Sequence, residues 1–141
     1  MKTWLADTGP LVAYLDAGDP SHVQVATRLG EFSGALVTTS AVITEAMHLL
    51  QVSRDGPHTL AEFVAASGMA VYDLCRPPEL HEAVLLMEKY ADTPMDFADA
   101  TLVLLAEGLD VREVLTLDRR GFSTYRTRLQ RHFRLVLDET S

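Results

Sequence analysis

Short apolar segments alternate with helix-forming segments along the whole sequence, and this alternation constrains the fold more than any other feature. Five short segments have the apolar character of buried strands, namely residues 4–6, 35–39, 70–74, 114–117 and 133–137. Most of them are continuously apolar, as strands covered on both faces are. The sequence therefore predicts an α/β fold with a mainly parallel central sheet of four to five strands, flanked by helices in three layers.

Capping and turn residues mark the helices between these strands. We expect Thr8 or Gly9 to cap the first helix, with Pro10 in its first turn, and Ser40 to cap a helix that runs to about residue 51. Gly108 is expected to stop a helix over residues 96–107. The other expected helices start after residue 21, at Pro57 and at Pro77 or Pro78.

The size and composition indicate one ordinary domain over residues 1–141. Its single cysteine, Cys75, cannot form an internal disulfide. The sequence shows neither an apolar leader nor a run of about 18 apolar residues, so we expect a cytoplasmic protein without membrane association.

Basic residues are concentrated near one end of an otherwise acidic chain. The net charge of -8 argues against a nucleic-acid partner, because phosphate affinity comes from Lys and Arg. Residues 112–134, however, hold seven of the twelve basic residues and only two acidic ones. This segment could hold an anionic polymer locally, and the alternative is a solvated stretch that forms salt bridges.

Four acidic residues from distant parts of the chain are placed to converge. Asp7 closes the first predicted strand and Asp118 closes the fourth. Glu45 lies early in the helix after the second strand, and Asp99 lies in the first turn of the helix before the fourth. Since the carboxyl ends of parallel strands share one edge of a sheet, all four side chains should meet there.

Such a cluster is costly without a cation, because each carboxylate raises the proton affinity of its neighbours. Mg²⁺ prefers oxygen ligands, and two metal ions about 4 Å apart can clamp the attacking and leaving oxygens of a phosphodiester. The four carboxylates together therefore favour metal-dependent phosphoryl chemistry. Each aspartate taken alone has a simpler explanation as a helix cap or a turn residue.

Four short motifs, taken in order, resemble those of the PIN-domain ribonucleases, especially the VapC-like toxins of toxin-antitoxin pairs. The motifs are DTGPLV at residues 7–12, TEA at 44–46, DFADA at 96–100 and LTLDRR at 115–120. Each motif is short, but their order and spacing are fairly specific. The resemblance covers essentially the whole chain, including residues 121–126.

The resemblance implies a single PIN-like domain and a Mg²⁺- or Mn²⁺-dependent endoribonuclease. Its metal-binding and catalytic residues would be Asp7, Glu45, Asp99 and Asp118. Asp96 could be a further ligand, although its place before a helix fits an N-cap equally well. Thr8 and Thr116 flank the expected site and could orient a carboxylate or a water.

RNA contact would rely on the basic segment, and the residues expected to make it are Arg119, Arg120, Arg126 and Arg128. If these arginines pair with acidic residues instead, their contribution to RNA binding is in doubt. Tyr125 is the one aromatic residue considered for base stacking. The family also implies a homodimer and a protein antitoxin that blocks the site.

The alternative function is a non-catalytic α/β interaction module that keeps the acidic edge as a metal or partner site. A receiver-like signalling domain would need a lysine at the end of its last strand, yet the only lysines are Lys2 and Lys89. Glu45 and His48 have the spacing of a di-iron motif, but no second copy exists. The sequence also lacks a Gly-rich phosphate loop and a Gly-x-Ser-x-Gly motif.

Overall fold

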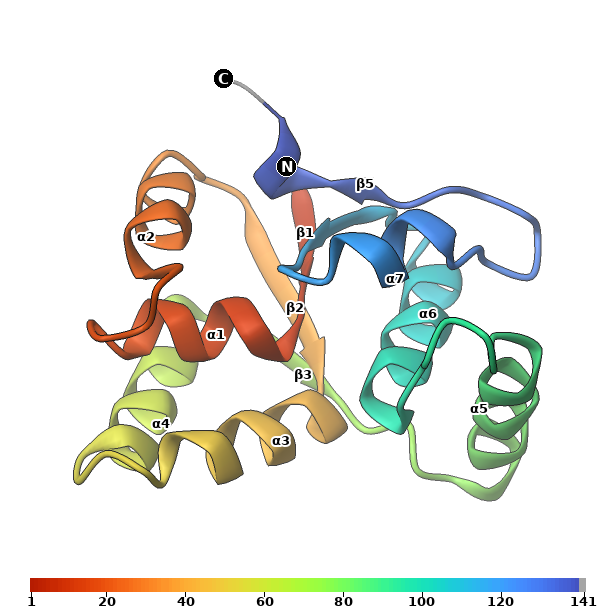
Figure 1. Ribbon diagram of the computed structural model, residues 1–141, viewed down its shortest axis with the longest axis horizontal. Coiled ribbons are helices and arrows are strands. Elements are labelled where there is room, and N and C mark those ends of the chain that lie inside the picture. Colours follow the sequence, from red (N-terminus) through yellow and green to blue (C-terminus); the bar gives the residue numbers. More distant parts are fainter. Residues whose placement is uncertain (140–141) are drawn as a thin grey trace.

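The computed structural model describes residues 1–139 and contains a five-stranded sheet with helices on both sides (Figure 1). The strand order is β3-β2-β1-β4-β5, and the four pairings between neighbouring strands are all parallel. The strands are β1 (Thr3–Ala6), β2 (Ala35–Thr39), β3 (Ala70–Tyr72), β4 (Glu113–Leu115) and β5 (Arg134–Leu135). The predicted α/β class and parallel sheet are confirmed.

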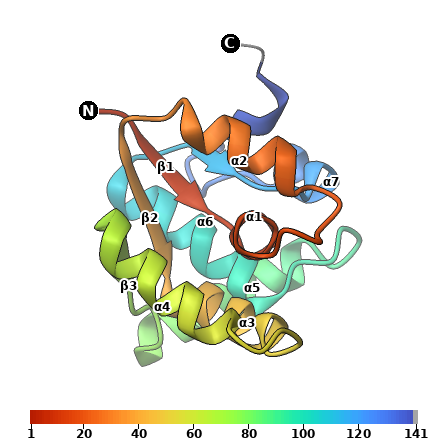
Figure 2. The same ribbon diagram turned by 90° about the vertical axis from the view of Figure 1, so that its left-hand side faces the viewer.

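Helices join the successive strands and cover both faces of the sheet, which makes three layers (Figures 1 and 2). They are α1 (Thr8–Leu15), α2 (His22–Gly30), α3 (Ser40–Leu50), α4 (Gly56–Ser67), α5 (Pro77–Lys89), α6 (Phe97–Leu109) and α7 (Arg119–Thr124). A 3-10 helix covers Val136–Asp138. Helices α1, α2 and α4 lie on one side of β1 and β2, and α5 and α6 lie on the other.

The core forms where strand and helix side chains meet. Leu5 of β1, Leu115 of β4 and Leu102 of α6 are fully buried. Near the amino-terminal end of β1, the ring of Trp4 stacks on that of Phe32 with ring centroids 3.7 Å apart. Burial of this apolar surface fixes the register of β1 between β2 and β4. No helix among the described residues is long and apolar enough to cross a membrane.

Several boundaries differ from the sequence prediction for local reasons. Asp7, and not Thr8 or Gly9, caps α1, and Thr39 caps α3. Helix α6 runs past Gly108 to Leu109, and Asp110 ends it with a left-handed φ of 53°. The last predicted strand is shorter than expected, because residues 136–138 form the 3-10 helix. These shifts leave the order of the elements unchanged.

Candidate active site

Asp7 lies at the carboxyl end of β1 and is buried, with 7% of its surface exposed. Its Oδ1 accepts a hydrogen bond of 2.8 Å from the backbone N–H of Thr8, which makes Asp7 the N-cap of α1. Its Oδ2 accepts a hydrogen bond of 2.7 Å from the hydroxyl of Thr116, in the loop after β4. Both carboxylate oxygens are therefore held in place by two separate segments of the chain.

Asp96 and Asp99 form a reciprocal capping box at the start of α6. The Asp99 N–H donates to Asp96 Oδ1 at 2.8 Å, and the Asp96 N–H donates to Asp99 Oδ2 at 3.2 Å. Asp96 is thus an N-cap, as its sequence position allowed, and Asp99 lies in the first turn as predicted. The box fixes two carboxylates on one helix start, where the helix dipole favours negative charge.

Asp118 does not close β4 directly, because the strand ends at Leu115 and Asp118 follows as the N-cap of α7. Its Oδ1 accepts a hydrogen bond of 2.9 Å from the N–H of Gly121. A Cβ at Gly121 would collide with Asp118 Oδ2, so only glycine lets the carboxylate lie this close to the helix. The fourth strand thus ends two residues before its predicted end at residue 117, and a short loop brings Asp118 to the carboxyl edge of the sheet.

Burial and mutual repulsion raise the pKa values of several of these carboxylates. Burial raises the pKa of Asp7 to about 6, and repulsion from Asp96 and Asp118 adds to the rise. Burial likewise raises the pKa of Asp99 to about 8, with further contributions from Asp7 and Asp96. Burial also raises the pKa of Glu45 on α3, and Asp96 adds to that rise. Each of the five acidic residues thus interacts electrostatically with at least one other of them, and their assignment to one metal site stays a prediction.

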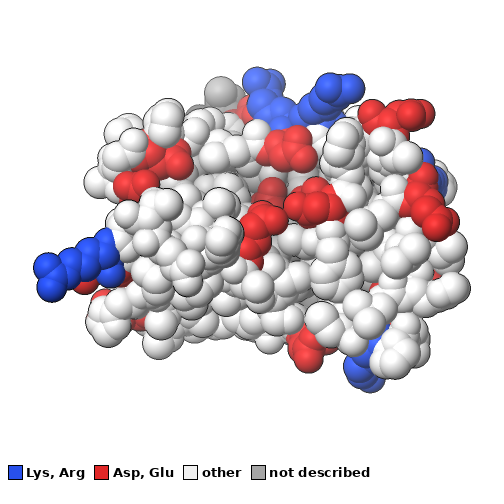
Figure 3. Space-filling model, turned by 60° about the horizontal axis from the view of Figure 1, so that its bottom comes forward, with Lys and Arg blue, Asp and Glu red and all other residues white. Residues whose placement is uncertain are grey.

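The cluster opens onto one face of the molecule. Figure 3 shows acidic side chains gathered around a hollow near the centre of this face, with Lys and Arg side chains toward its edges. The Thr8 hydroxyl oxygen is buried here and has no hydrogen-bond partner among the described residues. It still lies near enough to Glu45 to oppose the rise in its pKa. A hydrated cation would both supply a partner for Thr8 and relieve the repulsion, so the donor set fits a hard divalent metal.

The side chains do not yet form a ready-made metal site. Among residues 1–139, no group of three or more His, Cys, Asp or Glu side chains is arranged to hold one metal ion. One oxygen of each of Asp96, Asp99 and Asp118 accepts a hydrogen bond from a backbone N–H at the start of its own helix. The second oxygen of each of these carboxylates makes no capping hydrogen bond and is the one that could bind a metal ion.

The four arginines expected to contact RNA differ in their surroundings. Arg128 pairs with Glu107 at 2.6 Å and with Glu82 at 2.8 Å, and Arg119 pairs with Asp138 at 3.2 Å. Arg126 donates to backbone carbonyls of residues 123–125. Arg120 is exposed and makes no salt bridge with any residue that the structure describes. Pairing therefore removes most of the support for Arg128 as an RNA contact.

Tyr125 is buried, which excludes the base-stacking role considered from the sequence. Its hydroxyl donates a hydrogen bond of 2.7 Å to the carbonyl of Pro94, just before the capping box. Burial raises the pKa of Tyr125, and the nearby Asp99 and Asp118 add to the rise. Tyr125 thus links α7 to the start of α6, a role that the sequence pattern gave no means of finding.

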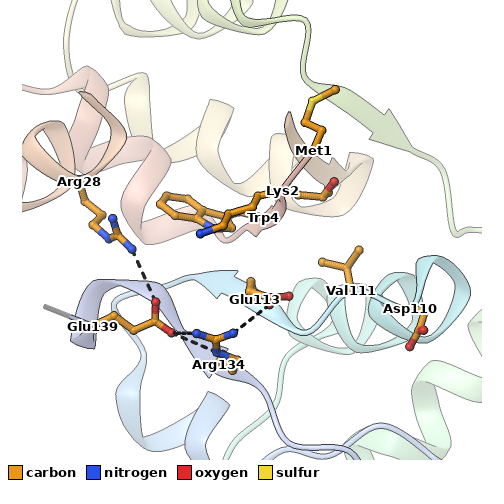
Figure 4. A pocket seen from close by; sticks show the side chains of 10 residues that line it. Met1, Lys2, Trp4, Arg28, Asp110, Val111, Glu113, Arg134 and Glu139 are labelled. Atoms are coloured by element: carbon orange, nitrogen blue, oxygen red, sulfur yellow. Dashed lines mark hydrogen bonds and ion pairs between the residues drawn. The ribbon is translucent and has the colours of Figure 1, made fainter. Parts of the chain in front are cut away.

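A separate cavity of about 300 Å³ lies at the amino-terminal ends of β1 and β4, at the opposite edge of the sheet. Figure 4 shows Glu139 between Arg28 and Arg134, with Trp4 and Lys2 beside them. Glu139 lies 3.6 Å from Arg28 and 2.7 Å from Arg134. These arginines are already neutralised within the chain, so the cavity is a weaker candidate for the functional site than the acidic cluster.

Comparison with known proteins adds two similarities, although no protein-family model matches the chain. The chain is 33% identical over 124 residues to Ribonuclease VapC26 of Mycobacterium tuberculosis. The aligned region covers 86% of this chain and 91% of that protein. The fold matches the crystal structure of M. tuberculosis VapC20, described as a toxin that cleaves the sarcin-ricin loop. That match has a TM-score of 0.71 and 18% identity over 83% of this chain and 91% of VapC20, so it concerns the fold alone.

Proposed function

This chain belongs to the VapC family of PIN-domain ribonuclease toxins, and we propose that it is a Mg²⁺- or Mn²⁺-dependent endoribonuclease and the toxin of a toxin-antitoxin pair. The observation that carries the proposal is the acidic cluster at the carboxyl edge of the sheet. Burial and repulsion raise the pKa of Asp7 to about 6 and that of Asp99 to about 8. Such a site is suited to a cation that compensates the negative charge.

The residues that would hold the metal are Asp7, Glu45, Asp99 and Asp118, with Asp96 as a further ligand. A divalent ion bound there would polarise the phosphodiester and lower the pKa of a bound water. Asp7 would be the most rigid of these ligands, because Thr116 and the Thr8 N–H fix its two oxygens. Rigid placement of one ligand reduces the reorganisation that metal binding requires.

The charge distribution supports an RNA substrate that approaches the face with the acidic hollow. The metal would offset the carboxylates, and the exposed Arg120 on α7, two residues after Asp118, would contact a phosphate. Family membership further implies a protein antitoxin and a homodimer, and both stay predictions. A cytoplasmic location likewise stays a prediction.

The proposal is tested by replacing each carboxylate with its uncharged amide. We expect Asp7→Asn, Glu45→Gln, Asp99→Asn and Asp118→Asn each to abolish RNA cleavage in Mg²⁺ or Mn²⁺. The matched controls are Asp92→Asn, in the turn before the capping box, and Glu62→Gln on α4, which should cleave at the unmodified rate. A variant of the cluster that retains full activity would remove that residue from the site.

A second measurement separates the enzyme from the non-catalytic alternative. If the unmodified protein binds Mn²⁺ and is stabilised by it, but cleaves no RNA under any metal condition, the interaction module is the better description. Stabilisation by metal together with metal-dependent cleavage supports the nuclease.

A further inference from the structure

A mainly apolar cavity of about 450 Å³ opens beside the acidic cluster, between the start of α3 and the start of α6. Its apolar lining comes from Ala41 on α3 and from Phe97 and Ala98 on α6. Glu45 and Asp96 line it as well, and both belong to the acidic cluster. The cavity is therefore continuous with the candidate active site.

The charges around the cavity restrict what can occupy it. Among the described residues that line it there is no Lys or Arg, so nothing there would compensate a phosphate. Its apolar walls favour a neutral group, because an uncompensated charge loses its hydration on entry. The half-buried Phe97 offers an aromatic surface, and the exposed His48 offers ring nitrogens for hydrogen bonds at the rim.

We infer that this cavity binds a nucleobase of the RNA substrate next to the phosphate held at the acidic cluster. The inference rests on the proposed nuclease function and adds a subsite to it. A base is neutral, has two flat apolar faces and carries polar atoms at its edge, which matches the aromatic wall and the polar rim. The phosphate stays with the metal at the cluster, and the base enters the cavity next to it.

The test compares two probes of equal charge that differ only in their bases. One is a pentaribonucleotide with phosphorothioate linkages, which slow hydrolysis, and the other is the same pentamer without bases. Binding to the full chain is measured in Mg²⁺ at one fixed salt concentration, because phosphate affinity depends on salt. We expect the base-containing pentamer to bind at least about fivefold more tightly, as expected for one base–aromatic contact.

Two variants locate this preference in the cavity. Ala41→Met fills the cavity from α3, and Phe97→Leu keeps the apolar packing of residue 97 while removing its ring. Both variants should lower the affinity for the base-containing pentamer by about fivefold or more and leave the affinity for the base-free pentamer unchanged. Matched controls are Ala61→Met on the exposed face of α4 and Phe63→Leu, whose ring contacts Tyr14.

Three results would overturn the inference: equal affinity for the two pentamers, no measurable binding of either, or equal weakening of both by Ala41→Met and Phe97→Leu. RNA cleavage in Mg²⁺ is measured separately on the unmodified protein. A protein that cleaves RNA but binds both pentamers equally would keep the nuclease function and lose the base subsite. A protein that prefers the base-containing pentamer but cleaves no RNA would keep the base subsite and lose the nuclease function.

Discussion

The Thr116 hydroxyl donates a hydrogen bond of 2.7 Å to Asp7 Oδ2, although the two residues lie 109 positions apart in the sequence. The hydroxyl oxygen of Thr116 in turn accepts a hydrogen bond of 2.9 Å from the N–H of Asp118. One buried hydroxyl thus joins the end of β1 to the loop after β4 and sets the spacing between two proposed metal ligands. The sequence placed Thr116 beside the site, but only the fold reveals this bridge.

Thr116→Val should lower the rate of metal-dependent RNA cleavage by about 10- to 100-fold, the usual cost of losing a residue that orients a ligand. Valine has nearly the same shape, so the loss would come from the missing hydrogen bonds. The pKa of Asp7 should rise further, because the hydroxyl favours its charged form. Thr59→Val on α4, which loses only an exposed hydrogen bond, is the control and should leave cleavage unchanged.

Stability of the metal-free protein should depend on pH through Asp7 and Asp99. Their pKa values are raised from 3.8 to about 6 and about 8, so the folded state binds more protons than the unfolded chain between about pH 4 and pH 8. This contribution to stability is complete below about pH 4 and is lost as pH rises through 6 for Asp7 and 8 for Asp99. For Asp7 it amounts to about 3 kcal/mol.

Asp99→Asn should therefore be more stable than the unmodified protein above about pH 8 in the presence of a chelator, and the difference should shrink toward pH 4. Urea unfolding across this range measures it, and Asp92→Asn should follow the unmodified curve. Added Mg²⁺ should restore stability at high pH in the unmodified protein. Parallel stability curves for Asp99→Asn and the unmodified protein would contradict the repulsive cluster.

Tyr125→Phe removes the hydrogen bond to the Pro94 carbonyl while keeping the buried ring. We expect the free energy of unfolding to fall by about 1 kcal/mol, because a partly buried hydrogen bond is lost. RNA cleavage should also fall at saturating metal, since Pro94 leads directly into the capping box of α6. Tyr72→Phe on the exposed strand β3 should change neither property.

Arg120 and Arg128 should differ in their effect on RNA binding. Arg120→Ala is expected to reduce the slope of log affinity against log salt by about one, as for loss of one phosphate contact. Arg128→Ala should leave that slope unchanged and lower stability slightly, because its charge is already paired with Glu82 and Glu107. Equal slopes for the two variants would show that ion pairing does not decide which arginine meets RNA.

The order of strands and helices could be predicted because burial on both faces leaves a continuous apolar signal in the sequence. The helix α7 could not, since residues 119–124 have little apolar periodicity and the helix depends on the Asp118 cap and on burial of Phe122. The acidic residues could be assigned to one edge from topology alone. The pairing of Arg128 with Glu82, 46 positions away, depends on tertiary contacts that no local pattern encodes.

The capping hydrogen bonds give the acidic cluster a built-in spectroscopic reporter. The amide protons of Thr8, Asp99 and Gly121 each donate to a carboxylate that is proposed to bind the cation, namely Asp7, Asp96 and Asp118. When the cation withdraws charge from those oxygens, the three amide resonances should move together in a nuclear magnetic resonance titration. Occupancy of the metal site could thus be followed from the backbone amides, without any substrate.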